Sequence, residues 1–272
     1  MGLGSAPRQT VTPPRIVGIV LVRDEDLMIE RAVRNAVHFC DEWIFCDHAS
    51  RDKTPKILER LCGDIPSARL LRINHPKESH EAVKGHAGQK CWIFGLDGDE
   101  VYDPFGLARL RARLLSGEFD EWWMILGNVL HVTQLAANHA TGHLAPPCRS
   151  MTKLYNFQAI DSWDGYCVER LHGGFPMFRD GFSAARRFAM HESTAWEKSD
   201  FRCLHLCFQA RSSRGDSGNT RPNIMETFGS NRWTEWLSPL RRLRAGWKHE
   251  RYRRGPEIAV DTLPFFGSDA PQ

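Results

Sequence analysis

The chain has 272 residues, of which 42% are hydrophobic and 25% charged, and its formal net charge is +3. These are the values of an ordinary globular protein, and so small a charge gives no reason to expect a nucleic-acid partner. No apolar stretch approaches the roughly 20 residues that cross a bilayer. Residues 1–14 lack the apolar core of a signal peptide, so we expect a flexible N-terminus and a cytoplasmic protein.

The eight cysteines are expected to be mostly reduced in that compartment. Cys203 and Cys207 flank His205, but no pair of cysteines has the C-x-x-C spacing of a structural zinc site. We therefore interpret the cysteines as buried free thiols.

Short apolar runs alternate with helix-like segments over the first hundred residues. The expected strands are 15–22, 42–47, 68–73 and 91–96, and the expected helices are 24–39, 50–62 and 78–89. Because each helix is short and each strand is a nearly continuous apolar run, the pattern predicts a parallel sheet with right-handed crossovers.

The pattern changes after residue 100. We expect a helix at 103–117, a strand at 121–132, a polar loop at 133–150 and a further strand at 151–157. From about residue 160 onward the sequence is irregular and rich in Trp, His and Gly. The segment 241–254 carries seven basic residues and one acid.

Acidic residues follow several of the expected strands: Asp24, Asp47, Asp97 and Asp99. In parallel sheets, ligands collect beyond the carboxyl ends of the strands. Asp97-Gly98-Asp99 could hold Mg²⁺ or Mn²⁺ through carboxylate oxygens and leave positions for substrate phosphates. The alternative is a solvated acidic turn.

Asp47 precedes a small polar turn and a helix. Its carboxylate could accept a hydrogen bond from a nucleobase N–H or a ribose hydroxyl. The alternative is an aspartate that only caps the turn or the helix.

Three segments together resemble the family 2 glycosyltransferases of GT-A fold: LVRDEDLMIERAVRNA (21–36), IFCDHASRDKTPKIL (44–58) and WIFGLDGDEVYDP (92–104). The resemblance implies a GT-A-like, Rossmann-type α/β fold with a mostly parallel sheet flanked by helices. It also implies a nucleotide-diphosphate sugar donor, most often a UDP-sugar, and a divalent cation. Asp24, where the family usually has Asn, and His48, where it has a small residue, depart from the family pattern.

The resemblance also assigns roles to individual residues. It implies that Asp47 contacts the nucleobase or ribose, that Asp24 and Glu25 lie against the base, and that Asp97, Gly98 and Asp99 form the metal–diphosphate site. GYCVERLHGG (165–174) resembles the motif of the catalytic base, which would be Glu169, and AMHESTAW (189–196) offers Glu192 as a competitor. FRCLHLCFQARSS (201–213) offers His205 as the third metal ligand.

We therefore expect a glycosyltransferase domain at 15–215, with a nucleotide-sugar half at 15–105 and an acceptor half at 106–215. It would transfer a sugar, with inversion, to a hydroxyl of a glycan, a lipid-linked molecule or a small molecule. Residues 216–272 are expected to form a basic helical extension, and 233–254 to touch the inner face of a membrane. A solvated helix that packs through its tryptophans is the alternative to membrane contact.

Three rival functions remain open at this point. A sugar nucleotidyltransferase usually has a glycine-rich basic loop after the first strand, and LVRDEDLMIE has none. A non-catalytic nucleotide- or carbohydrate-binding protein on the same scaffold is disfavoured by the intact Asp97 and Asp99. Nucleic-acid binding through 241–254 lacks the aromatic-interleaved groove motif that would support it.

Overall fold

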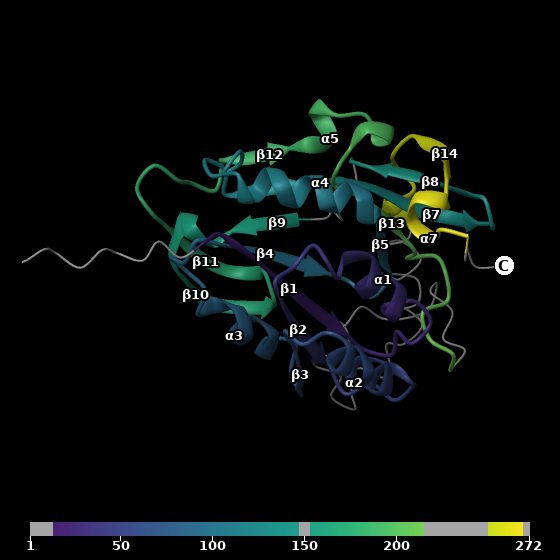
Figure 1. The fold of residues 1–272 in the computed structure, drawn as a ribbon, viewed down its shortest axis with the longest axis horizontal. Coiled ribbons are helices and arrows are strands. Elements are labelled where there is room, and N and C mark those ends of the chain that lie inside the picture. The colour runs from purple at the N-terminus through teal and green to yellow at the C-terminus, as the bar shows by residue number, and fades with distance from the viewer. Residues whose placement is uncertain (1–12, 147–152, 215–249, 269–272) are drawn as a thin grey trace, which may run out of the picture.

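The structure, a computed structural model, describes residues 13–146, 153–214 and 250–268 (Figure 1). A seven-stranded sheet in the order β12-β6-β9-β4-β1-β2-β3 forms its centre. Its strands are β1 (Arg15–Val22), β2 (Glu42–Asp47), β3 (Ala68–Arg72), β4 (Cys91–Leu96), β6 (Met124–Leu126), β9 (Lys153–Asn156) and β12 (Arg187–Ala189). Only β9 runs antiparallel to its neighbours. The predicted α/β fold with a mostly parallel sheet is therefore confirmed.

The side chains of β1 alternate between two cores, one on each face of the sheet. Ile16, Val20 and Val22 join a core that includes residues of α1 (Ile29–Ala36), α2 (Thr54–Asp64) and α4 (Pro104–Leu115). Val17, Ile19 and Leu21 join a second core with Val83 of α3 (Glu78–Lys84). A strand that is buried on both faces explains the unbroken apolar sequence of residues 16–22.

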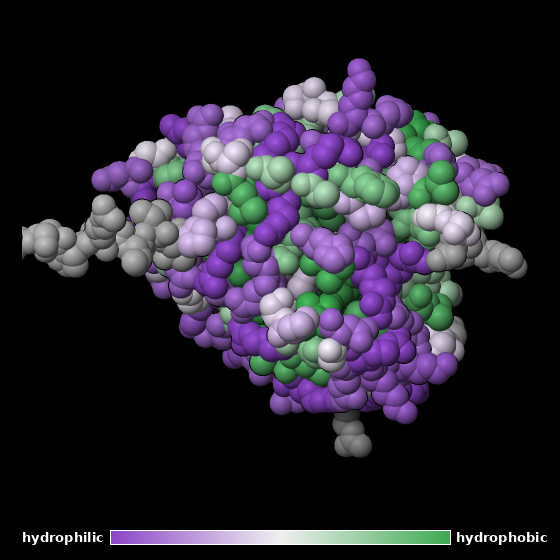
Figure 2. Space-filling model, in the orientation of Figure 1, coloured by the Kyte–Doolittle hydropathy of each residue, from purple (hydrophilic) through white to green (hydrophobic). Residues whose placement is uncertain are grey.

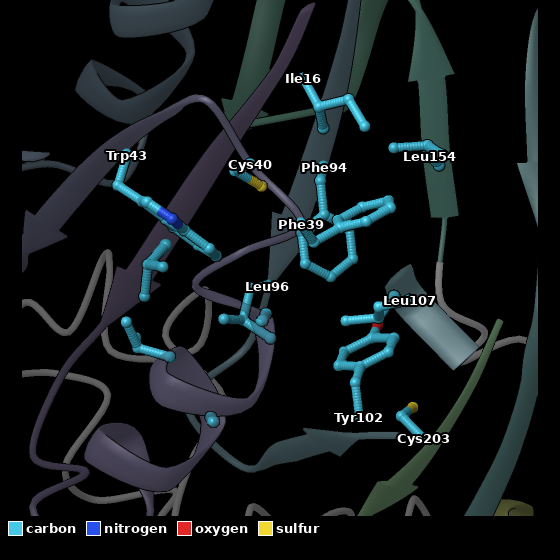
Figure 3. Close-up of a cluster of buried hydrophobic side chains, with 14 of the residues drawn as sticks. Ile16, Phe39, Cys40, Trp43, Phe94, Leu96, Tyr102, Leu107, Leu154 and Cys203 are labelled. Atoms are coloured by element: carbon cyan, nitrogen blue, oxygen red, sulfur yellow. The ribbon is translucent and has the colours of Figure 1, made fainter. Parts of the chain in front are cut away.

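Aromatic rings fill the centre of the first core (Figure 3). The ring of Phe94 lies 5.1 Å from those of Phe39 and Tyr102 and 6.5 Å from that of Trp43, measured between centroids. All three contacts are edge-to-face, an arrangement that the ring quadrupole favours.

A five-stranded sheet in the order β14-β8-β7-β13-β5 lies beside the first. It consists of β5 (Glu100–Tyr102), β7 (Asn128–Leu135), β8 (His139–Ala145), β13 (Arg202–His205) and β14 (Glu257–Asp261). One face of this sheet adds Tyr102, Val129 and Cys203 to the first core, and the other face packs on α7 (Leu263–Phe266).

A two-stranded hairpin, β10 (Ile160–Glu169) and β11 (His172–Phe178), packs against α3. Short helical turns complete the described elements: α5 (Met190–Ser193) and the 3₁₀ turns Phe157–Ala159 and Trp196–Lys198. Figure 2 shows that hydrophilic side chains cover most of the face turned to the viewer. None of the helices in the described ranges is long and apolar enough to cross a membrane.

The predicted strands up to residue 96 are confirmed to within a residue, and the predicted helices are present but shorter. The expected loop at 133–150 is wrong, because β7 continues to Leu135 and β8 occupies His139–Ala145. The sequence of β8 is polar and contains two histidines, so it does not have the pattern of a strand. Pairing with β7 and β14 supplies the backbone hydrogen bonds of β8. The expected basic helix over 216–272 lies mostly outside the described residues, and β14 is the strand within it.

Candidate functional site

The site lies where the connection pattern of the first sheet reverses. The chain passes from β1 to β2 and β3 on one side, and then returns to place β4 on the other side of β1. Such a switch point leaves a crevice beyond the carboxyl ends of the two strands, where ligands of open α/β sheets bind. Asp24 and Glu25 follow β1, and Asp97 and Asp99 follow β4, so these acids lie at the carboxyl ends of the two strands.

Glu25 and Asp99 share one guanidinium group. Nε of Arg211 lies 3.0 Å from Oδ2 of Asp99, and an Nη atom of Arg211 lies 3.5 Å from Oε1 of Glu25. Both carboxylate side chains are buried, at 5% exposure or less. Two carboxylates so close together would repel each other, and Arg211 supplies the counter-charge.

The electrostatic balance around Asp99 favours its ionised form. Burial alone would raise the pKa of Asp99, but the charges of Arg211 and His205 outweigh burial and hold that pKa well below its usual range. Oδ2 of Asp99 is buried and accepts no hydrogen bond, although Nε of Arg211 lies 3.0 Å away. The charge on this carboxylate is balanced by Arg211 at 3.0 Å and His205 at 3.5 Å.

Gly98 permits the close approach of Glu25. A Cβ atom at Gly98 would lie 2.1 Å from Oε2 of Glu25 and 3.0 Å from a methyl group of Val22. The glycine between the two aspartates thus serves the packing of the neighbouring loop.

Asp97 and Glu169 meet on a second guanidinium group. Arg170 lies in the turn between β10 and β11, where its φ of 21° is unusual for a residue with a side chain. It donates to Oδ1 of Asp97 at 2.5 Å and to the Leu96 carbonyl at 2.9 Å, and it lies 3.5 Å from Oε1 of Glu169. The hairpin therefore brings Glu169 to the carboxyl end of β4.

The pKa of Glu169 is unfavourable for a base in this arrangement. Burial would raise it, but the charge of Arg170 and the hydrogen bond from His172, at 3.3 Å, lower it to about 2. A carboxylate of such low pKa is a weak proton acceptor near neutral pH.

Asp47 and Asp24 meet at a second turn. Oδ1 of Asp47 accepts a hydrogen bond from the Ser50 N–H at 3.2 Å, and Ser50 Oγ accepts one from the Asp24 N–H at 2.9 Å. The capping role for Asp47 is therefore present. Its Oδ2 lies 3.7 Å from Arg72, and the side chain is 3% exposed.

Glu192 lies apart from these residues. It belongs to α5, its side chain is 76% exposed, and its ion-pair partner is the neighbouring His191 at 3.8 Å. The chain just after Glu192 is bound to the starts of two strands: Asn128 of β7 donates to the Thr194 carbonyl, and Arg202 of β13 donates to the Trp196 carbonyl. His205 is at the other end of β13.

Each ring nitrogen of His205 has a neighbour of its own. Its Nε2 lies 3.5 Å from Oδ2 of Asp99, and its Nδ1 lies 2.8 Å from Nδ1 of His131 on β7. Burial disfavours the charged imidazole, but Cys207 and Asp99 outweigh burial and raise the pKa of His205 well above its usual value. The contact between Asp99 and the residue expected as a third metal ligand is therefore present.

The donor atoms suit a hard divalent cation in kind. Asp97 and Asp99 offer carboxylate oxygens, His205 offers an imidazole nitrogen, and Oδ2 of Asp99 accepts no hydrogen bond. Arg170 and Arg211 now hold these carboxylates, so a cation would replace part of their charge. Within the described ranges, the one group of three metal-capable side chains whose ligand atoms all lie within 4.8 Å of one another is a different one: His131, His205 and Cys207.

The sequence did not predict three residues of the site: His131, Arg170 and Arg211. The arginines gave no signal, because each meets its carboxylates through tertiary contact. His131 did give one, since NVLHV (128–132) and RCLHL (202–206) carry a histidine at the same step of two alternating apolar segments. These segments pair in register, His131 opposite His205.

Comparisons with known proteins give likeness in structure alone. No family model matches the chain, and no curated protein sequence matches it. A mannosyltransferase from Pyrobaculum calidifontis, solved with GDP-mannose and Mn²⁺, is similar over 91% of this chain and 68% of its own, at 16% identity and a TM-score of 0.41.

Two further structures are similar over smaller parts. Glucosyl-3-phosphoglycerate synthase from Mycobacterium tuberculosis, solved with Mn²⁺ and UDP, matches 58% of this chain at 14% identity and a TM-score of 0.34, and this chain covers 64% of it. A 4-diphosphocytidyl-2C-methyl-D-erythritol synthase from Anaerococcus prevotii matches 54% of this chain and 72% of its own, at 12% identity and a TM-score of 0.35. Likeness at these TM-scores and identities carries no function over to this chain.

Proposed function

We propose that this chain is a divalent-cation-dependent glycosyltransferase that uses a nucleotide-diphosphate sugar, with a UDP-sugar as the first candidate. The observation that carries the proposal is the gathering of Glu25, Asp97 and Asp99 at the switch point between β1 and β4. Buried or arginine-bound carboxylates at such a crevice suit a cation and the diphosphate that it accompanies.

Asp97 and Asp99 would hold the cation, with His205 as the third ligand that the family resemblance implies. When bound, the cation would neutralise the charge that develops on the departing diphosphate. Asp47 would accept a hydrogen bond from the nucleoside, and the chain at Asp24 and Glu25 would lie against the base.

Glu169 is the better candidate for the base. Arg170 contacts both Glu169 and Asp97, whereas Glu192 is exposed in α5. The Glu169 carboxylate would take the proton of the acceptor hydroxyl as that oxygen attacks the anomeric carbon, and the nucleoside diphosphate would leave from the opposite face. Arg170 must first move away from Glu169, because it holds the pKa of that carboxyl near 2.

A thermal-shift panel of UDP- and GDP-sugars with and without Mn²⁺ tests the proposal. We expect Mn²⁺-dependent stabilisation by one donor, with slow release of the nucleoside diphosphate. Stabilisation without any release over long incubation, with or without acceptors, would favour a binding protein. A panel without Mn²⁺-dependent stabilisation would contradict the proposal.

The Asp99→Asn variant ties the assay to the site. We expect it to lose the Mn²⁺-dependent shift and to slow turnover at least 100-fold, because several kcal/mol of transition-state stabilisation depend on a bound metal. Asp161→Asn is the matched control, since this carboxylate lies on the hairpin, is 64% exposed and pairs with Arg179. A near-normal rate in Asp99→Asn would reject the role of Asp99.

Membrane contact through 233–254, which would place the enzyme at the inner face of a membrane, is a separate proposal. Most of this segment lies outside the described residues, and Arg251, Arg253 and Arg254 at its end are exposed. We expect co-sedimentation with anionic liposomes that falls as salt is raised. Sedimentation independent of anionic lipid would count against it.

A further inference from the structure

A row of polar side chains crosses one face of the second sheet. Strand register places His143 opposite His131, His131 opposite His205, and His205 opposite Glu100. Residues that are paired across neighbouring strands point to the same face of a sheet. This is the face of Val129 and Cys203, which pack into the first core, so the histidines are on the same face of the second sheet as these core residues.

Three metal-capable residues of this region are buried. His131 is 0% exposed, His205 6% and Cys207 1%, and their ligand atoms all lie within 4.8 Å of one another. The ring of Tyr252 packs on both imidazoles, with centroids 4.7 Å from His131 and 5.6 Å from His205. An exposed acidic cluster is stable in water without an ion. Two imidazoles and a thiol are polar groups that are costly to bury unless they have partners.

The donor atoms select a class of metal. Imidazole nitrogen and thiolate sulfur bind zinc and similar transition metals, whereas magnesium and calcium prefer oxygen. Two nitrogens on one tetrahedral zinc lie about 3.3 Å apart, given Zn–N bonds of about 2.0–2.1 Å. The Nδ1 atoms of His131 and His205 are 2.8 Å apart, so a small rotation of the rings would open the pair to that distance.

We propose that Nδ1 of His131, Nδ1 of His205 and Sγ of Cys207 bind one zinc ion, and that a fourth position is left to water or another small ligand. Cys207 loses its thiol proton to solvent as the Zn–S bond forms, and the proton that joins the two Nδ1 atoms leaves as the Zn–N bonds form. The ligands come from β7, from the end of β13 and from the turn after it, which hydrogen-bonds back to the chain through Leu206 N–H and the Asp99 carbonyl at 2.8 Å.

The second nitrogen of His205 supports this assignment. A zinc-bound histidine commonly donates its other ring N–H to a carboxylate, which fixes the orientation of the ring. Nε2 of His205 lies 3.5 Å from Oδ2 of Asp99, which is within ion-pair distance, and this hydrogen bond would form on a small approach of the two groups. The inference goes beyond the proposed function and changes one part of it: Asp97 and Asp99 stay with the hard cation, whereas His205 becomes a zinc ligand that positions Asp99.

Metal analysis and cobalt substitution test the zinc site without nucleotide and without activity. We expect about one zinc per chain in protein purified with zinc in the medium. After exchange for Co²⁺ we expect a thiolate-to-cobalt charge-transfer band and the d–d bands of a four-coordinate site. Wild-type protein that holds no stoichiometric zinc and gives no thiolate-to-cobalt band would overturn the proposal and leave the two histidines as a simple hydrogen-bonded pair.

Cys207→Ser should lower zinc affinity at least 10-fold and abolish the charge-transfer band, and His131→Gln should lower the affinity similarly. Cys46→Ser is the matched control, because Cys46 is equally buried but lies in β2, outside the cluster. Equal zinc binding in Cys207→Ser and Cys46→Ser would also contradict the site. Asp97→Asn should keep its zinc whatever it does to nucleotide binding, so failure of the zinc site and failure of the glycosyltransferase proposal can be told apart.

Discussion

Neighbouring carboxyl groups of the site have opposite electrostatic environments. Asp99 lies beside Arg211 and His205, and its pKa is depressed. Burial raises the pKa of Glu100 to about 8, and the charge of Asp97 adds to the rise. Glu100 also accepts a hydrogen bond from the Tyr102 hydroxyl at 3.0 Å, which partly offsets burial. Groups whose environments push their pKa values apart in this way are typical of functional sites.

Glu100 should make the folded protein less stable as the pH rises. The group binds its proton more tightly in the folded chain, with a pKa of about 8 against an ordinary 4.5. Its contribution to the free energy of unfolding is therefore complete below about pH 4.5 and is lost as the pH rises through about 8. Glu100→Gln should remove this loss, on the order of a few kcal/mol, and so gain stability relative to wild type at pH 8–9.

Urea unfolding at pH 5, 7 and 8.5 measures the effect. Glu121→Gln is the control, because its side chain is 65% exposed and its pairing with Arg186 at 3.6 Å should contribute little. Equal pH dependence in wild type and Glu100→Gln would show that Glu100 is already ionised in the folded protein at pH 7.

Sequence predicted the acids of the site but not the groups that hold them. Asp24, Asp47, Asp97 and Asp99 could be placed because each ends or follows a strand, and strand ends of a parallel sheet share an edge. Arg170 and Arg211 come from the β10–β11 turn and from the segment after β13, whose approach depends on tertiary packing. The interpretation of Cys207 as a simple buried thiol likewise missed a tertiary contact, because His131, which lies close to it in space, comes from β7.

Among the elements, β1 makes a close packing contact in the first sheet through a glycine. It pairs with β2 on one side and β4 on the other, and its Gly18 faces the indole of Trp43. A Cβ atom at Gly18 would lie 2.5 Å from a ring carbon of Trp43, which is fully buried and cannot withdraw. Strand periodicity predicted β1 correctly, but it gave no information on this contact.

Gly18→Ala should therefore lower the free energy of unfolding by about 1–3 kcal/mol through overpacking. Gly63→Ala, in α2, should be neutral or stabilising by up to about 1 kcal/mol, because no atom lies within 4 Å of the added carbon and alanine favours the helix. Chemical denaturation of both variants measures the difference. If Gly18→Ala were as stable as Gly63→Ala, the packing of Trp43 on β1 would be wrong.

At the scale of the whole molecule, the site joins the two sheets. Asp99 connects β4 of the first sheet to β5 of the second, and the segment after β13 returns across the end of β1. In that segment the Arg211 carbonyl accepts from the Leu27 N–H at 3.0 Å, and Ser212 Oγ donates to Asp52 at 2.7 Å. Contacts of this kind, between loop residues far apart in the sequence, cannot be predicted from sequence patterns, because the polar residues of a loop have no periodicity.

Arg211 should be the strongest single electrostatic contact of this junction. Arg211→Gln leaves the buried carboxylates of Glu25 and Asp99 without their shared cation, so we expect a loss of about 2–4 kcal/mol in chelator. Mn²⁺ should restore part of this loss and should stabilise the variant more than it stabilises wild type, because the bound ion replaces the missing guanidinium charge. Arg109→Gln removes a cation that is 57% exposed and pairs with Asp200, so it should cost less than 1 kcal/mol and respond to Mn²⁺ like wild type. Thermal and urea unfolding of the three proteins, each with chelator and with Mn²⁺, separate the two effects. If Arg211→Gln were as stable as wild type in chelator, the shared ion pair would be wrong. If Mn²⁺ stabilised Arg211→Gln no more than it stabilises wild type, a cation site at Asp99 would be refuted.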